Sequence, residues 1–324
     1  ILPGVDAAAL AREPLAQAVT DVPASAASGV VEYAVGYSNY EKFVTSSELP
    51  EYFKGCVYVL EDHAVLIPGG LLLDQGRFKA KYGGAVFSLD AMGDRTCRNA
   101  WEAFTENILL RFPKVDETTF APELAPGALV NRQGTSAVNT YWPVQTDRKP
   151  GDASLFVNHI KQLLPMGDDA DILITYMAAL VQNPGHKFQW CPIVQGPEGN
   201  GKTAIMECMM RAVGEKYCHL PNAQDLGGNG SKFTAWLQRK LFIGVEEIYC
   251  ADRREVTEML KPLITNRRIE IQAKGSNQVT GDNRANWLMM TNHKDAVPVG
   301  IDSRRYCTLY CKHQSADELL AAGM

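Results

Sequence analysis

The sequence predicts an α/β protein with a parallel sheet in its C-terminal half, preceded by a helical subdomain and a small α+β N-terminal region. A strand-like segment at 188–195 leads through a glycine-rich loop into a helical segment at 204–213. Two further apolar, strand-like segments at 240–247 and 286–292 each end in polar residues. The strand, loop and helix in this order, followed by the two later strands, are the basis for predicting the sheet.

The chain divides into regions where its composition changes. Residues 1–29 read as a helix followed by an Ala/Ser/Pro/Gly-rich linker, and the first residue, Ile1, indicates a fragment of something longer. Residues 30–150 read as a small α+β domain, with strands expected at 56–60, 64–67 and 85–87 and a helix at 98–109. Residues 151–324 read as one larger domain, with a helical lead-in at 151–187 and a core at 188–313.

Charge and cysteine usage narrow the class of protein. The net charge of −5 disfavours a protein that binds nucleic acid over its whole surface, although a small basic patch inside a channel remains compatible. No apolar run is long enough to span a membrane, so we expect no membrane partner. The eight scattered cysteines favour a reduced, intracellular protein. Cys307, Cys311 and His313 resemble a metal-ligand set, but their alternating strand-like segment favours small core residues.

The glycine-rich loop carries the most specific pattern, G-x-x-x-x-G-K-T. It consists of Gly196, Pro197, Glu198, Gly199, Asn200, Gly201, Lys202 and Thr203. Glycines allow the backbone to curl so that its N–H groups point at phosphate oxygens, and the helix expected from Ala204 adds its positive end. We expect Lys202 to reach the β- and γ-phosphates of ATP and Thr203 to hold Mg²⁺. We include Ala204 among the nucleotide-binding residues. The alternative, a chance glycine-rich turn, does not explain the strand and helix on either side.

The segment 240–247 is an apolar strand that ends in two acids, Glu246 and Glu247. Nucleotide hydrolysis needs one carboxylate near the metal ion and one that positions and activates the attacking water. We assign Glu246 to the Mg²⁺ side and Glu247 to the water. The alternative is that both acids cap the following turn.

Two polar positions further along the chain complete the predicted site. Asn292 ends the strand at 286–292 and is expected to contact the γ-phosphate or the attacking water, although Asn also favours ordinary strand ends. Arg304 and Arg305 precede the last strand, and either one is a candidate to stabilise transition-state charge in a neighbouring subunit. We favour Arg305, because it adjoins the strand. Paired arginines also occur in plain surface ion pairs.

The segment 267–277 reads as a β-hairpin. Ile269 and Ile271 alternate with polar residues, and Gly275 offers a turn beside Lys274. A lysine at a hairpin tip is suited to contact a phosphate backbone, so Lys274 and Gly275 are our candidate DNA-binding residues. A solvated hairpin lysine would have the same sequence.

These elements, in this order and within about 110 residues, resemble a superfamily 3 helicase, most closely the helicase part of phage and poxvirus-type primase–helicases. The glycine-rich loop looks like the Walker A motif of that family, Glu246–Glu247 like its Walker B motif and Asn292 like its sensor. Lys274 falls where the family has a DNA-contacting hairpin, and Arg304–Arg305 where it carries an arginine finger. Segment 138–143 resembles the lead into the helicase core. The residues after Lys274 depart from the family, because Ser276 and Asn277 stand where basic or aromatic residues are common.

The resemblance implies an AAA+-like P-loop NTPase core that assembles into a ring, a hexamer, with ATP and Mg²⁺ between subunits. It implies hairpins that line a channel around single-stranded or forked DNA, and an N-terminal primase or primase–polymerase domain outside this chain. It further implies the cytoplasm of a bacterial or archaeal host, if the protein is phage or plasmid encoded. The expected function is therefore an ATP-dependent DNA helicase in phage- or plasmid-type replication. Two alternatives keep the nucleotide site: a ring ATPase that does not unwind DNA, such as a packaging or remodelling motor, and an ATP-regulated replication scaffold.

Overall fold

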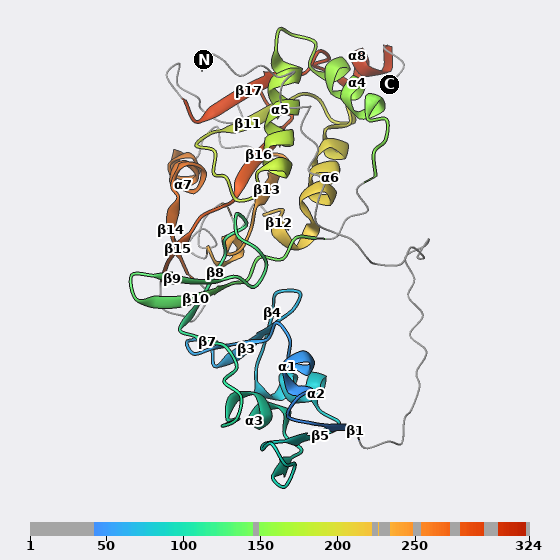
Figure 1. The fold of residues 1–324 in the computed structure, drawn as a ribbon. Coiled ribbons are helices and arrows are strands. Elements are labelled where there is room, and N and C mark those ends of the chain that lie inside the picture. The colour runs from blue at the N-terminus through green and yellow to red at the C-terminus, as the bar shows by residue number, and fades with distance from the viewer. Residues whose placement is uncertain are drawn as a thin grey trace, which may run out of the picture. The chain divides into compact units, whose positions relative to one another are not determined.

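A computed structural model describes residues 42–144, 149–221, 226, 234–248, 254–272, 279–294 and 304–321 (Figure 1). The helix and linker expected at 1–29 lie outside the described residues. Lys42–Met324 forms a compact unit. Among the described residues, no helix has both the length and the apolar character needed to cross a membrane.

The first part of this unit is a small α+β region with two sheets. One sheet has the strand order β1-β5-β6 and the other has the order β4-β3-β2-β7. The strands are β1 (Lys42–Val44), β2 (Val57–Val59), β3 (Ala64–Ile67), β4 (Leu71–Leu73), β5 (Ala85–Ser88), β6 (Thr96–Cys97) and β7 (Lys114–Val115). The helices are α1 (Leu49–Tyr52), α2 (Gln75–Tyr82) and α3 (Ala100–Thr105). The three strands expected from sequence are β2, β3 and β5.

Helix α3 is shorter than the helix expected at 98–109. It ends at Thr105, and Ile108 is exposed rather than packed with Trp101 and Phe104. The side chain of Asn107 accepts hydrogen bonds from the Leu109 and Leu110 N–H groups, at 3.0 and 2.9 Å. This local turn competes with the helix for the same backbone donors.

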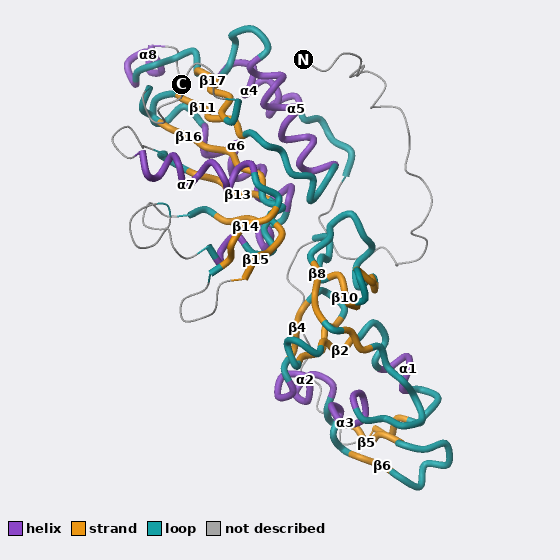
Figure 2. Tube along the Cα trace, turned by 90° about the vertical axis from the view of Figure 1, so that its left-hand side faces the viewer, coloured by secondary structure: helices purple, strands orange, loops and turns teal. Residues whose placement is uncertain are grey.

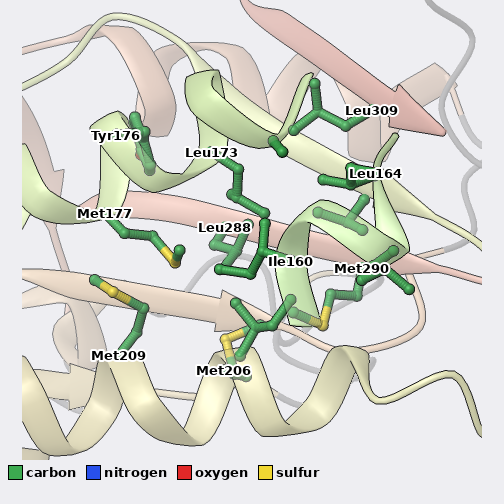
Figure 3. Close-up of a cluster of buried hydrophobic side chains, with 14 of the residues drawn as sticks. Ile160, Leu164, Leu173, Tyr176, Met177, Met206, Met209, Leu288, Met290 and Leu309 are labelled. Carbon is green, nitrogen blue, oxygen red and sulfur yellow. The ribbon is translucent and has the colours of Figure 1, made fainter. Parts of the chain in front are cut away.

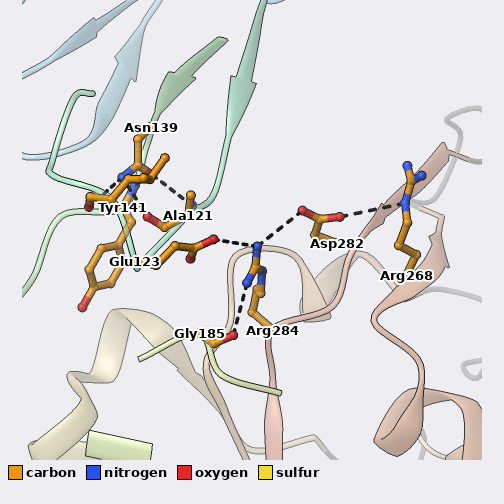
Figure 4. A network of polar contacts seen from close by, with 9 residues as sticks. Ala121, Glu123, Asn139, Tyr141, Gly185, Arg268, Asp282 and Arg284 are labelled. Atoms are coloured by element: carbon orange, nitrogen blue, oxygen red, sulfur yellow. Dashed lines mark hydrogen bonds and ion pairs between the residues drawn. The ribbon is translucent and has the colours of Figure 1, made fainter. Parts of the chain in front are cut away.

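A third sheet, of three strands, lies between this region and the C-terminal half in the sequence. Its strands are β8 (Glu117–Thr119), β9 (Leu129–Arg132) and β10 (Thr135–Asn139), in the order β8-β10-β9. Asn139 ends β10 and is fully buried. Its Nδ2 donates to the carbonyls of Ala121, Leu124 and Ala125 at 2.9, 3.2 and 3.0 Å, and its Oδ1 accepts from the N–H groups of Ala121 and Tyr141 at 3.0 Å each (Figure 4). One side chain therefore holds the loop that follows β8.

Replacing Asn139 with alanine is expected to destabilise the protein by about 3 kcal/mol, because several buried backbone groups lose their partners at about 1 kcal/mol or more each. Chemical denaturation measures the change. Asn131→Ala is the matched control, because Asn131 accepts one hydrogen bond, from the Gly134 N–H in an exposed turn. Equal stabilities for the two variants would contradict the role given to Asn139.

The C-terminal half contains a five-stranded sheet in the order β12-β13-β16-β11-β17, and every neighbouring pair is parallel. Its strands are β11 (Cys191–Gln195), β12 (Cys218–His219), β13 (Phe242–Val245), β16 (Asn286–Thr291) and β17 (Tyr306–Tyr310). The helices are α4 (Ser154–Leu163), α5 (Asp169–Gln182), α6 (Lys202–Val213), α7 (Arg254–Thr265) and α8 (Ala316–Ala321), with 3-10 turns η1 (Glu215–Tyr217) and η3 (Ala235–Leu237). The antiparallel pair β14 (Arg268–Ile271) and β15 (Val279–Asp282) forms a separate hairpin. The predicted mixed α/β class with a parallel sheet is confirmed.

The central strands are buried on both faces, as a parallel sheet covered by helices requires. Val194, Leu288 and Met290 pack with α4, α5 and α6 in one cluster (Figure 3). Trp287 and Met289, at the alternate positions of β16, pack with α7 and the β14–β15 hairpin in another cluster. Figure 2 shows α4 and α5 on one side of the sheet and α7 with the hairpin on the other. The helices cover the two faces of the sheet, and the polar loops lie at the carboxyl ends of its strands.

Candidate functional site

Three adjacent strands, β13, β16 and β11, end at the same edge of the sheet, where their following loops meet. Gln195 lies beside Thr291 in the ladder, and the Gly196 N–H donates to the Thr291 carbonyl at 3.1 Å. The Ile248 N–H donates to the Met290 carbonyl at 2.9 Å. A cavity of about 370 Å³ opens between these loops and is lined by Glu198, Gly199, Asn200, Gly201, Lys202, Thr203, Glu246, Glu247, Met290, Thr291 and Asn292. The fold thus brings the three predicted polar motifs together around one space.

The loop after β11 requires glycine at several positions. Gly199 and Gly201 have φ of +81° and +87°, in the left-handed region that glycine adopts without strain. A Cβ on Gly201 would lie 2.6 Å from Cε1 of His159 in α4, and one on Gly196 would lie 2.6 Å from Sγ of Cys311. Both neighbours restrict the loop to one backbone path.

Lys202 begins helix α6, two residues earlier than the start expected at Ala204. Its side chain folds back into the loop, where Nζ donates to the carbonyls of Gly196 and Pro197 at 2.6 Å each and to Oδ1 of Asn200 at 3.0 Å. Burial lowers the pKa of the Lys202 ammonium, and the carboxylates of Glu198 and Glu247 partly offset this effect. The cation is therefore held inside the loop by neutral oxygens, in the place where a phosphate would be a stronger partner.

Thr203 lies next to Lys202 and is exposed to the cavity, and Ala204 is exposed but does not line it. The Ala204 N–H already donates to the Gly201 carbonyl at 3.2 Å. Of the residues predicted to bind nucleotide, those from Glu198 to Thr203 line the cavity, and Gly196 and Pro197 supply carbonyls behind it.

Glu246 and Glu247 follow β13 and are both exposed where they line the cavity. Neither carboxylate accepts a hydrogen bond from any part of the chain that the structure describes. Residues 249–253, which follow, lie outside the described residues, so the alternative in which the two acids cap the next turn stays open. Glu247 has φ of +55°, which costs a non-glycine residue roughly 1–3 kcal/mol. Such strain is found at sites where the side-chain direction matters more than stability.

Asn292 follows β16, half-buried, and faces the cavity between the glycine loop and the two acids. The preceding Thr291 is buried, and its Oγ1 accepts a hydrogen bond from the His293 N–H at 3.0 Å. This bond fixes the backbone turn that presents Asn292.

Arg304 and Arg305 do not line this cavity. The Arg305 carbonyl accepts from the Cys191 N–H at 2.9 Å, so the pair lies at the amino ends of β11 and β17. The cavity lies at the carboxyl end of β11, roughly 15 Å away at about 3.3 Å per residue. In a single chain the two arginines and the cavity are therefore at opposite edges of the sheet.

Lys274 and Gly275 lie outside the described residues. The strands on either side, β14 and β15, pair antiparallel, and Ile269 and Ile271 face the core as their alternation predicts. The hairpin is thus observed, while the contact made by its tip stays a prediction.

Sequence reasoning missed several residues that shape the cavity. Met290 and Thr291 line it directly, His159 contacts Gly201, and Cys311 is buried against Gly196. His159 Nε2 lies 3.3 Å from the Gly201 carbonyl. Met290 and Thr291 directly precede Asn292 in the predicted strand, whereas His159 and Cys311 come from distant parts of the chain, and their local sequence carries no sign of the contact.

Comparison with known proteins shows the fold. A family model described as a family of unknown function (DUF5906) matches residues 194–305. No curated protein matches the chain. The apo structure of the NrS-1 C-terminal region superposes with a TM-score of 0.60 at 16% identity, covering 80% of this chain and 60% of that one. This chain shares the fold of that region.

A second structure of the same region, its A form, gives a TM-score of 0.59 at 15% identity over 86% of this chain and 63% of that one. The chain therefore spans about three fifths of the length of the NrS-1 region. A structure of JCV helicase with a bound small molecule aligns with a TM-score of 0.33 over 52% of this chain, at 14% identity, which is too loose to carry an argument.

Proposed function

We propose that this chain is an ATP-dependent DNA helicase of the superfamily 3 type, which hydrolyses ATP at subunit interfaces of a ring. The observation that carries the proposal is the cavity where Lys202, Glu246, Glu247 and Asn292 meet at the ends of three adjacent parallel strands. Loops beyond the carboxyl ends of parallel strands are where α/β proteins bind their ligands. The glycine-rich loop between β11 and α6, with Lys202 at the start of the helix, supports an assignment to the P-loop class.

The residues around the cavity fit ATP and Mg²⁺. Glycine-loop N–H groups and the buried Lys202 ammonium suit the phosphates, and the hydroxyl of Thr203 with the carboxylate of Glu246 suits Mg²⁺. Bound Mg²⁺ would neutralise phosphate charge. Glu247 would accept a proton from the attacking water, and the Asn292 amide would orient that water or the γ-phosphate.

The arrangement of charges favours hydrolysis over transfer to a second substrate. Glu246 and Glu247 end β13 as two adjacent carboxylates, one for the metal ion and one for water. The proposed helicase therefore hydrolyses ATP with water, and the free energy of hydrolysis changes the contacts between subunits.

The position of Arg305 supports a site shared between subunits. It lies at the opposite edge of the sheet from its own cavity, so a role in hydrolysis requires that it reach the cavity of a neighbour. A ring, expected as a hexamer, places each arginine edge against the next cavity.

Mixing two inactive variants tests this sharing. Arg305→Ala and Glu247→Gln are each expected to lose most ATPase activity, and a mixture is expected to recover part of it, because some interfaces then combine an intact Arg305 with an intact Glu247. Steady-state ATP hydrolysis across mixing ratios measures the recovery. Arg304→Ala, tested in the same way, decides which arginine acts. Absence of recovery at every ratio for both arginines would argue against a shared site.

The proposed substrate is single-stranded or forked DNA, contacted by Lys274, which the sequence predicts at the turn between β14 and β15. A forked-DNA unwinding assay with ATP, beside a mass measurement of the assembly, tests the whole proposal. Unwinding by an oligomeric ring is expected. ATP hydrolysis without unwinding would instead favour a non-unwinding motor, and ATP binding without hydrolysis would favour a regulated scaffold.

A further inference from the structure

A second cavity, of about 260 Å³, lies at the base of the β14–β15 hairpin. It is near the amino ends of β11 and β16, whereas the candidate nucleotide site lies at their carboxyl ends. Four cationic side chains line it, Lys187, Arg267, Arg268 and Arg284, together with one carboxylate, Asp282. We call this cavity the hairpin-base pocket. Nothing in the proposed hydrolysis uses it.

The pocket has more positive charge than its acidic neighbours neutralise. Asp282 lies 3.9 Å from both Arg268 and Arg284, and Glu123 lies 3.1 Å from Arg284 (Figure 4). Arg267 forms no ion pair within the described part of the chain. Among the described residues, the three arginines alone outnumber the two carboxylates, so the pocket has a net charge of at least about +1 before Lys187 is counted, in a chain whose overall net charge is −5. Such a concentration of one sign attracts anions.

The innermost cation, Lys187, is buried, and no carboxylate in the described part of the chain pairs with it. Its side chain is 7% exposed, and Nζ donates to the carbonyl of Leu263 at 3.1 Å and to that of Ala285. Burial lowers the pKa of Lys187 to about 7. An anion bound in the pocket would offset the cost of burying this charge.

The walls of the pocket are fixed by buried amides. Asn283 Nδ2 donates to the carbonyls of Leu263 and Asn266 at 2.7 and 2.9 Å, which ties the end of β15 to the end of α7. Asn286 Nδ2 donates to the His186 carbonyl at 2.7 Å, which holds the turn that carries Lys187. The backbone segments that carry the cations are therefore fixed before any ligand arrives, which lowers the cost of binding.

We propose that the hairpin-base pocket binds a phosphate of the backbone of single-stranded nucleic acid. Arginine guanidinium groups suit phosphate oxygens, and Arg267 and Arg268 are exposed at the pocket, where a polymer can reach them. The pocket lies where Arg268 and Asp282 pair at the open end of the hairpin, and the four-residue strands run roughly 13 Å from it, so a nucleic-acid strand that follows the hairpin would pass the pocket. The inference rests on the proposed function, because it assumes that nucleic acid is the substrate.

Binding of a labelled single-stranded DNA oligonucleotide, followed by fluorescence anisotropy over a salt series, tests the pocket. Arg267→Glu/Arg268→Glu is expected to weaken binding at least tenfold and to reduce the slope of log K against log salt by about 0.7, because the pocket contacts one phosphate and each phosphate contact on single strands contributes about 0.7. The control is Arg111→Glu/Arg132→Glu, which makes the same change in net charge at two exposed arginines outside the pocket. Control binding should stay near that of the unmodified chain.

The outcomes separate the pocket from the proposed function. If the unmodified chain binds the oligonucleotide and both double variants bind equally well, the pocket proposal is wrong while the helicase proposal stands. If the unmodified chain binds no single-stranded DNA, both are wrong. Arg267→Ala/Arg268→Ala repeats the test without added negative charge, and thermal denaturation of each variant checks that the fold is intact. An unchanged salt slope in the alanine variant would overturn the phosphate contact.

Discussion

Lys202→Ala is expected to lower ATP hydrolysis by roughly 10²–10³-fold, the range for removing one group that stabilises transition-state charge. The Lys202 ammonium is the one lysine charge that lines the candidate cavity among the described residues. Its three partners are two carbonyls and an amide oxygen, none of which carries a charge. A nucleotide phosphate would therefore lose its strongest contact with the loop.

The same substitution is expected to leave the fold intact. Burial already disfavours the charged form of Lys202, as its lowered pKa shows, so removing the charge relieves a cost while it breaks three hydrogen bonds. Lys161→Ala is the matched control, because Lys161 is exposed on α4 and does not line the cavity. ATP binding and turnover are measured beside the thermal midpoint. Full activity of Lys202→Ala would remove the assigned role, and loss of its fold would contradict the expected stability.

The sequence predicted the strands and loops of the core because their signals are local. Each of three motifs could be identified because it directly follows an apolar, strand-like segment: the glycine loop, the double acid after β13 and Asn292. Their meeting around one cavity depends on β16 lying between β13 and β11, and strand order is a long-range property that no local pattern encodes.

Other features of the structure could not be predicted from local sequence patterns, because they depend on contacts between residues far apart in the chain. Strand β10, Thr135–Asn139, is short and partly polar, and its sheet depends on the buried hydrogen bonds of Asn139 rather than on an apolar run. Lys187 and Arg267, which line the hairpin-base pocket together, are 80 residues apart in the sequence, and His159 and Gly201, which are in contact, are 42 residues apart. Burial and partners of such side chains follow from the assembled fold.

Glu247→Gln is expected to retain ATP binding while turnover falls by about 10²–10⁴-fold, the contribution typical of a positioned general base. Glutamine has nearly the same shape as glutamate, so the strained backbone at φ +55° and the lining of the cavity should persist. The lost property is proton acceptance. Single-turnover hydrolysis and equilibrium binding of ATP, measured separately, distinguish the two effects.

Glu246→Gln is the matched control for this prediction, because it makes the same chemical change one residue earlier on the same cavity wall. If Glu246 serves Mg²⁺ and Glu247 serves water, Glu246→Gln should raise the Mg²⁺ concentration needed for half-maximal activity, and Glu247→Gln should leave that requirement unchanged. Interchanged phenotypes would reverse the two roles without disturbing the site. Normal turnover in both variants would mean that neither carboxylate takes part in hydrolysis, and the strain at Glu247 would then need another explanation. The two substitutions, at adjacent residues after β13, thus test whether water is the nucleophile in this cavity.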